Sequence, residues 1–157
     1  MTEPVEITLS HAHIFTLLGK HNMPKEHLNP PELFNSQQYG FSQIVTSRSG
    51  KTVYLSGQVG WDAQQQMVGP GDPLAQTRQT LRNIATAMQI AGGALRDVVS
   101  MRIYIVDDVM DDDSFMTQAL LEFFPNDQLP ATTWIGVKSL ANKDFLVEIE
   151  AIGVIEE

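Results

Sequence analysis

The segment that most constrains the fold is the C-terminal run 145–155, in which apolar and acidic residues alternate. Successive side chains of a β-strand point to opposite faces of the sheet, so the two faces of this run can be read separately. One face is apolar throughout, and the other combines two glutamates with large apolar residues: Phe145, Val147, Ile149 and Ala151 against Leu146, Glu148, Glu150 and Ile152. The first face suits packing under helices, whereas the mixed face is typical of a contact between subunits.

The other segments predict the order of elements around this strand. Residues 41–47, 52–56, 98–106 and 132–139 are rich in β-formers, and the first two runs predict a hairpin that turns at Gly50. A first helix begins at Asp72-Pro73 and ends at Gly92-Gly93, and a second spans about 114–124 after an acidic run that caps it. The order is ββαβαββ, an α+β fold with two helices on one face of a mixed sheet.

The first helix is amphipathic, because Leu81, Ile84 and Met88 recur at helical spacing on one side. Asn83 falls on the opposite side, which we expect to face water.

The chain divides near Asn29-Pro30-Pro31, where adjacent prolines interrupt regular structure. We expect an N-terminal arm, residues 1–35, followed by one domain, residues 36–157. All the histidines, His11, His13, His21 and His27, lie in the arm and are expected to be solvated. The absence of cysteine excludes disulfides, thiolate zinc sites and cysteine nucleophiles, and we expect no metal and no other cofactor.

Charge and hydropathy exclude two classes of partner. The net charge is −9, and the ten Lys and Arg residues are dispersed, so we expect no binding to the phosphates of nucleic acid. No uncharged apolar run approaches the ~18 residues that a membrane span needs. The N-terminus carries two glutamates before its first short apolar stretch, which is unlike a secretory signal, and we expect a cytoplasmic protein.

Four segments, taken in order, resemble one family. They are Val53–Val59 (VYLSGQV), the helix ending at Ala91-Gly92, Val98–Asp107, and Leu129-Pro130-Ala131 with Val147–Ala151. Together they resemble the Rid (reactive intermediate deaminase) family, also called the YjgF or L-PSP endoribonuclease family, over residues 40–155. The resemblance implies a chorismate-mutase-like fold and a homotrimer in which the uncovered sheet faces form a central barrel. It also implies three small-molecule clefts between neighbouring subunits.

The resemblance also implies roles for single residues. The deaminase branch of the family hydrolyses imines and enamines to 2-oxo acids and ammonia. Position by position, Ser56, Gly57 and the aromatic Phe41 correspond to substrate-binding residues, and Glu148 to the catalytic glutamate that helps place water. The family's arginine, which grips the substrate carboxylate with paired hydrogen bonds, is replaced by Thr132. We therefore expect poor activity on ordinary 2-imino acids.

Several interpretations stay open on the residues alone. Arg102 is a candidate for the missing positive charge in substrate binding, although a salt bridge to Glu148 or Glu150 is the simpler interpretation. Trp61 and Trp134 are predicted to be packing residues. The favoured function is hydrolysis of an imine, enamine or related reactive metabolite. The alternative is a trimer that binds a small metabolite without catalysis, and the acidic charge places endoribonuclease or translation-inhibitor activity third.

Overall fold

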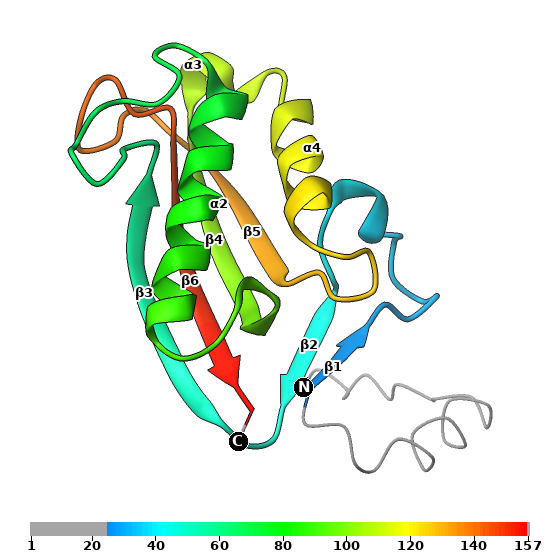
Figure 1. The fold of residues 1–157 in the computed structure, drawn as a ribbon. Coiled ribbons are helices and arrows are strands. Elements are labelled where there is room, and N and C mark those ends of the chain that lie inside the picture. The colour runs from blue at the N-terminus through cyan, green and yellow to red at the C-terminus, as the bar shows by residue number, and fades with distance from the viewer. Residues whose placement is uncertain (1–24, 157) are drawn as a thin grey trace, which may run out of the picture.

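The main sheet of the protein has four strands in the order β3-β6-β4-β5, in a computed structural model that describes residues 25–156. Strand β6 is antiparallel to both of its neighbours, while β4 and β5 are parallel, so the sheet is mixed (Figure 1). The strands are β3 (Lys51–Val59), β4 (Val98–Val106), β5 (Ala131–Val137) and β6 (Val147–Ile155).

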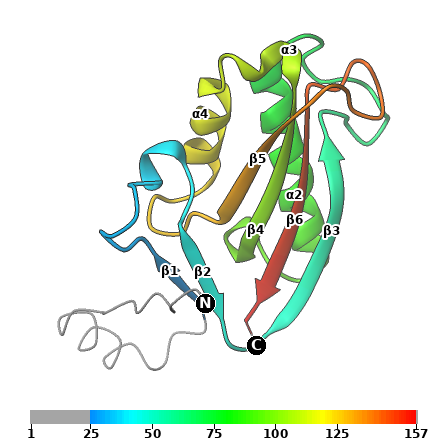
Figure 2. The ribbon, with the colours of Figure 1, turned by 180° about the vertical axis from the view of Figure 1, so that it is seen from behind.

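Two main helices, α2 (Pro73–Ile90) and α4 (Ser114–Phe123), cover the same face of this sheet (Figure 1). The shorter helical elements are η1 (Gln37–Tyr39), η2 (Leu95–Asp97) and α3 (Asp107–Met110). This arrangement confirms the predicted ββαβαββ order and the α+β class. Seen from behind, no element of residues 25–156 covers the other face, which we call the open face of the sheet (Figure 2).

Helix α2 begins and ends where the sequence predicts. The Asp72 side chain accepts a hydrogen bond from the Ala75 amide at 3.0 Å, and Pro73 occupies the first helical position. After the helix, Gly92 adopts a φ of 98°, which an L-residue with a side chain rarely tolerates.

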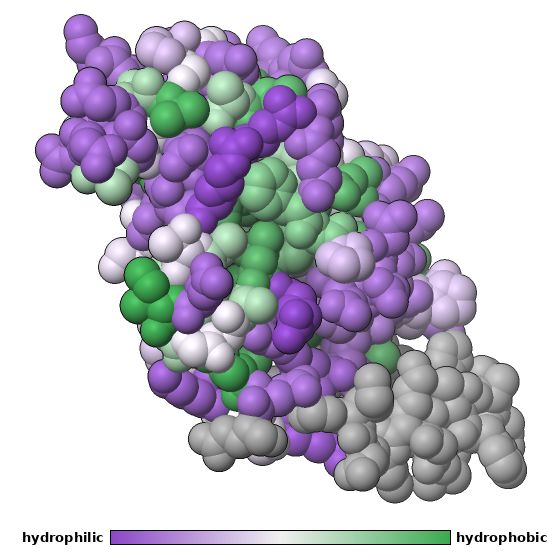
Figure 3. Space-filling model, viewed as in Figure 1, coloured by the Kyte–Doolittle hydropathy of each residue, from purple (hydrophilic) through white to green (hydrophobic). Residues whose placement is uncertain are grey.

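The core lies between the helices and the sheet. Leu81, Ile84 and Met88 of α2 are fully buried against the inward faces of β4 and β6, which contribute Met101, Ile103, Ile105, Val147 and Ile149. Burial of each such side chain contributes about 1.5–3 kcal/mol. The outer, helix-side surface is mostly hydrophilic, with apolar side chains interspersed along its middle (Figure 3). None of the helices within residues 25–156 has the length and apolarity to span a membrane.

The predicted hairpin between residues 41–47 and 52–56 was wrong. Strand β2 (Ile44–Ser47) pairs with β1 (Lys25–Leu28) in a separate two-stranded ribbon, and β3 pairs with β6. Gly50 has a φ of 123° and lies so close to the Ile155 carbonyl that a side chain would not fit. At Gly50 the chain passes the end of β6 and enters β3. Strands β2 and β3 diverge from this turn and do not lie side by side (Figure 1).

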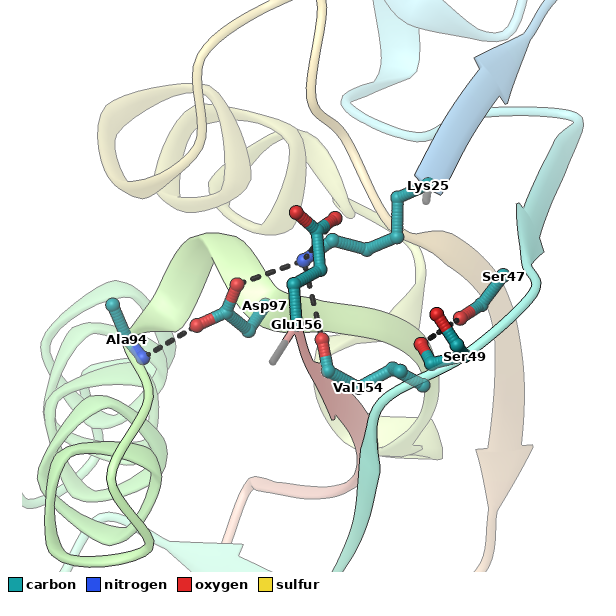
Figure 4. A network of polar contacts seen from close by, with 7 residues as sticks. All are labelled: Lys25, Ser47, Ser49, Ala94, Asp97, Val154 and Glu156. Carbon is teal, nitrogen blue, oxygen red and sulfur yellow. Dashed lines mark hydrogen bonds and ion pairs between the residues drawn. The ribbon is translucent and has the colours of Figure 1, made fainter. Parts of the chain in front are cut away.

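The β1–β2 ribbon is anchored by Lys25. Its ammonium lies 2.7 Å from Asp97 Oδ1, 3.2 Å from the Val154 carbonyl and 3.8 Å from Glu156 Oε1 (Figure 4). Asp97 Oδ2 in turn accepts a hydrogen bond from the Ala94 amide at 2.8 Å. The described part of the expected arm is thus joined to the domain by a nearly buried ion pair.

His27 provides a second anchor and corrects an expectation. Its Nδ1 donates to the Leu129 carbonyl at 2.8 Å. We expected a solvated histidine, and this expectation was wrong for His27. The strand at Lys25–Leu28 places it there. The rest of the arm, with His11, His13 and His21, lies outside the described residues.

Candidate functional site

A β-bulge in β3 shapes the first part of the site. Leu55 pairs with Ala151 and Gln58 with Ile149, so Ser56 and Gly57 together face Glu150 of β6. A bulge bends its strand and redirects the side chains beside it. Here it separates Ser56 and Gly57 into two different surface hollows.

Gly57 lies against the Glu148 side chain of the neighbouring strand. A Cβ atom at position 57 would overlap Glu148 Oε1 and would lie 2.8 Å from Cδ. Glu148 is half-buried and has no hydrogen bond or ion pair to any residue in 25–156. Its carboxylate is therefore available to a ligand.

These two residues open into a hollow of about 370 Å³, which we call the acidic hollow. It contains the carboxylates of Glu148 and Asp62, and no Lys, Arg or His among residues 25–156 lines it. Its lining residues are Gly57, Gln58, Val59, Trp61, Asp62, Asn83, Ala141, Phe145 and Glu148.

Asn83 of α2 fixes the wall of the acidic hollow, contrary to the expectation that it faces water. Its Nδ2 donates to the Val59 carbonyl at 3.0 Å and to the Trp61 carbonyl at 2.8 Å. Its Oδ1 accepts from Gln79 Nε2 at 2.9 Å. The end of β3 comes close enough to α2 to use this amide, which helical periodicity alone does not reveal.

Trp61 and Phe145 form the aromatic side of the hollow. Their ring centroids are 4.8 Å apart with an interplanar angle of 78°, an edge-to-face contact. Trp61, predicted as a packing residue, therefore also lines the acidic hollow. The two residues are far apart in the sequence, and no local pattern links them.

The loop before β6 is held by a buried amide of α2. Gln76 Nε2 donates to the Asp144 carbonyl at 3.0 Å, and Gln76 Oε1 accepts from the Leu146 amide at 2.9 Å. Gln76 is fully buried, so this loop cannot leave α2 without exposing unsatisfied polar groups. The position of Phe145 at the acidic hollow is fixed by the same contacts.

Ser56 lines a different hollow, of about 320 Å³, on the open face of the sheet. Arg102 and Glu150 lie there as cross-strand partners, and Arg102 Nη1 donates to Glu150 Oε1 at 2.6 Å. This hydrogen bond raises the pKa of Arg102 above its usual value. Of the two roles considered for Arg102, substrate binding and a salt bridge, the structure shows the salt bridge, and its partner is Glu150 and not Glu148.

Thr132 and Phe41 lie at the other edge of the sheet. Thr132 is on the outer strand β5, where its hydroxyl is buried without a partner among the described residues. Phe41 packs edge-on against Phe34 at 6.1 Å, and the Ser42 amide next to it donates to the Pro130 carbonyl. Two strands separate β5 from β3, which places the two edges about 14 Å apart. One copy of the chain therefore does not bring Thr132 and Phe41 together with Gly57 and Glu148.

Metal ligands are not grouped in the described part of the chain. No set of three or more His, Asp or Glu side chains within residues 25–156 is placed to hold a metal ion. In the acidic run, Asp112 accepts hydrogen bonds from the Ser114 hydroxyl at 2.6 Å and the Ser114 amide at 3.3 Å, which lower the pKa of Asp112.

Comparisons with known proteins show the family and the fold of the chain. A sequence model described as endoribonuclease L-PSP matches residues 35–155. A RutC family protein of Pyrococcus horikoshii is 35% identical over 112 residues, covering 71% of this chain and 84% of the relative. A 2-iminobutanoate/2-iminopropanoate deaminase of Dermatophagoides farinae is 34% identical over 116 residues, covering 74% and 86%. The crystal structure of YyfB, a Rid-family protein of unknown function from Yersinia pestis, superposes with a TM-score of 0.80 at 34% identity, covering 85% of this chain and 100% of that one.

Proposed function

Because the chain belongs to the endoribonuclease L-PSP family, also called the Rid or YjgF family, we propose that it binds a small metabolite between subunits and hydrolyses a C=N bond in it. One observation carries the proposal. The Glu148 carboxylate is unpaired within the described chain and faces a hollow beside Gly57.

The chemistry requires one positioned base and one water molecule. As water adds to the carbon of the C=N group, Glu148 accepts a proton from it. That proton then passes to the nitrogen and gives a carbinolamine. Glu148 next moves the hydroxyl proton of this intermediate to the nitrogen as the C–N bond breaks, and the products are a carbonyl compound and ammonia (or an amine). A deaminase among the relatives, from Dermatophagoides farinae, is named for two 2-imino acids, which supports this reaction class.

Ordinary 2-imino acids are poor substrates in this proposal. Recognition of their carboxylate calls for a guanidinium, and position 132 holds a threonine. Arg102 does not replace it, because its guanidinium is paired with Glu150 on the open face. The substrate is therefore an imine or enamine whose binding does not depend on a carboxylate.

The complete site needs more than one copy of the chain. Phe41 and Thr132 lie by the edge strand β5, whereas Ser56, Gly57 and Glu148 lie by the opposite edge. A homotrimer with β5 of one copy against β3 of the next would join the two sets in each of three clefts. The open sheet faces, with the exposed Tyr54, would then meet in a central barrel.

The test compares imines with and without a carboxylate. An amine oxidase generates carboxylate-free imines in situ and an amino-acid oxidase generates 2-imino acids, and trapping with semicarbazide follows their disappearance. We expect the chain to accelerate hydrolysis of the first group, and Glu148→Gln to lower that rate by about 100-fold or more. Glu150→Gln is the matched control, because Glu150 lies on the same strand but faces Arg102. Equal rates for Glu148→Gln and the unmodified chain would contradict the role of Glu148.

A metabolite-binding trimer without catalysis is the second candidate. The observation in its favour is that the described residues of the acidic hollow include carboxylates but no Lys, Arg or His to act as a general acid. No acceleration with any imine, together with a small molecule retained in native mass spectra of the purified trimer, would select this function. Endoribonuclease activity is disfavoured by the net charge of −9.

A further inference from the structure

We propose that the acidic hollow selects ligands that carry a positive charge, such as an amine or a protonated imine, and rejects carboxylates. This inference rests on the proposed function, because it names the class of substrate for the same site.

The charges in the hollow are of one sign. Glu148 and Asp62 line it, and no cationic side chain of the part of the chain that the structure describes does so. The contrast with Glu150 is informative, since Glu150 is two residues away on the same strand and is neutralised by Arg102 at 2.6 Å. Glu148 has no such partner within residues 25–156, so a cationic ligand would supply it.

Asp62 is fixed as a carboxylate acceptor by its own turn. Its Oδ1 accepts hydrogen bonds from the amides of Gln64 at 2.9 Å and Gln66 at 2.8 Å. These two hydrogen bonds hold the Asp62 carboxylate in one orientation at the wall of the hollow.

The aromatic side of the hollow also favours a cation. The faces of Trp and Phe rings carry negative electrostatic potential and attract ammonium groups. Trp61 is half-buried and Phe145, which packs against it, is almost fully buried, so Trp61 supplies aromatic carbon surface to the hollow in a partly desolvated setting. A ligand with an apolar body and a charged nitrogen matches this combination of rings and carboxylates.

The geometry is held before any ligand arrives. The Trp61 carbonyl accepts from Asn83, Trp61 pairs with Met67 across the loop, and Gln76 holds the loop that precedes β6. Lys143 is on that loop and is exposed, but it does not line the hollow. The selectivity is therefore not cancelled by a neighbouring cation of the described chain.

The test uses three probes with the same ring and different charge: benzylammonium, benzyl alcohol and benzoate. Trp61 fluorescence in a Trp134→Phe background reports binding, and calorimetric titration of the unmodified chain repeats the measurement without that substitution. We expect affinity to fall from benzylammonium to benzyl alcohol to benzoate. Glu148→Gln should weaken benzylammonium about tenfold and leave benzyl alcohol unchanged. Lys143→Ala is the control and should leave the order unchanged.

Two outcomes overturn the inference: benzoate binding as tightly as benzylammonium, or benzylammonium binding that Glu148→Gln does not weaken. Failure of the proposed function is separate from both. Cation preference without any imine hydrolysis would refute catalysis alone, whereas imine hydrolysis by a site that prefers benzoate would refute the charge selection alone.

Discussion

Gly57 lies directly against the carboxylate of Glu148, although the two residues belong to different strands. A Cβ atom at position 57 would overlap Glu148 Oε1 and come within 2.8 Å of Cδ. The requirement for glycine is one of space, because the φ of Gly57 lies outside the left-handed region. The glycine thus keeps the carboxylate in place at the acidic hollow.

Gly57→Ala should displace Glu148 while leaving the fold intact, because position 57 is exposed on the edge strand. Displacement of a reacting group by about 1 Å can lower a rate about 100-fold, and we expect a loss of this order in imine hydrolysis with unchanged circular dichroism. Gly136→Ala is the matched control, because its Cβ would make an ordinary contact of 3.4 Å with Asp107. Equal losses in the two variants would contradict the steric argument.

Lys25→Met should destabilise the chain, because Asp97 would lose its ion-pair partner. Lys25 and Asp97 have side-chain exposures of only 11% and 12%, so Asp97 would become a nearly buried, uncompensated charge. We expect the free energy of unfolding to fall by about 2–4 kcal/mol in urea titrations. Arg78→Met is the comparison, because its pair with Glu122 is exposed and holds the pKa of Glu122 at about 2. Arg78→Met should lower the free energy of unfolding much less than Lys25→Met does. A larger loss of this free energy from Arg78→Met than from Lys25→Met would contradict the importance of burial.

Local signals predicted much of this fold. Asp72-Pro73 and Gly92-Gly93 mark the ends of α2 because capping depends on residues within one turn. The alternation in β6 correctly assigned Val147 and Ile149 to the core and Glu148 to the opposite face. Both patterns depend only on residues that are close together in the sequence.

Pairing between distant segments could not be predicted in the same way. The turn at Gly50 is compatible with a hairpin, but β2 pairs with β1, and the backbone at Gly50 lies against Ile155 at the end of β6. Likewise, the edge-to-face contact of Trp61 with Phe145 joins two loops whose spacing in the sequence carries no signal. Asn83 was misplaced for the same reason, since its partners lie on β3 and the following loop.

Assembly depends, in our proposal, on the open face of the sheet. Tyr54 is 78% exposed there, which is typical of an aromatic residue that meets another subunit. Light scattering should give about three times the chain mass of 17.4 kDa, and Tyr54→Asp should lower it. Ile90→Asp, at a position on α2 that is 82% exposed, should leave the mass unchanged. A monomeric unmodified chain at micromolar concentration would refute both the trimer and the clefts.

Thr132→Arg should confer activity on ordinary 2-imino acids, because it restores the guanidinium that a carboxylate substrate needs. The unmodified chain should be slow with imines generated by an amino-acid oxidase, and the substitution should raise the rate about tenfold or more. The gain should remain partial, because the Thr132 side chain is largely enclosed and the acidic hollow still opposes an anion. Thr133→Arg is the matched control, since it places the same charge on the opposite face of β5, beside Arg102. Strong activity of the unmodified chain that Arg102→Ala abolishes would show that Arg102 binds the carboxylate, and strong activity that neither Arg102→Ala nor Glu148→Ala affects would refute this placement of the site.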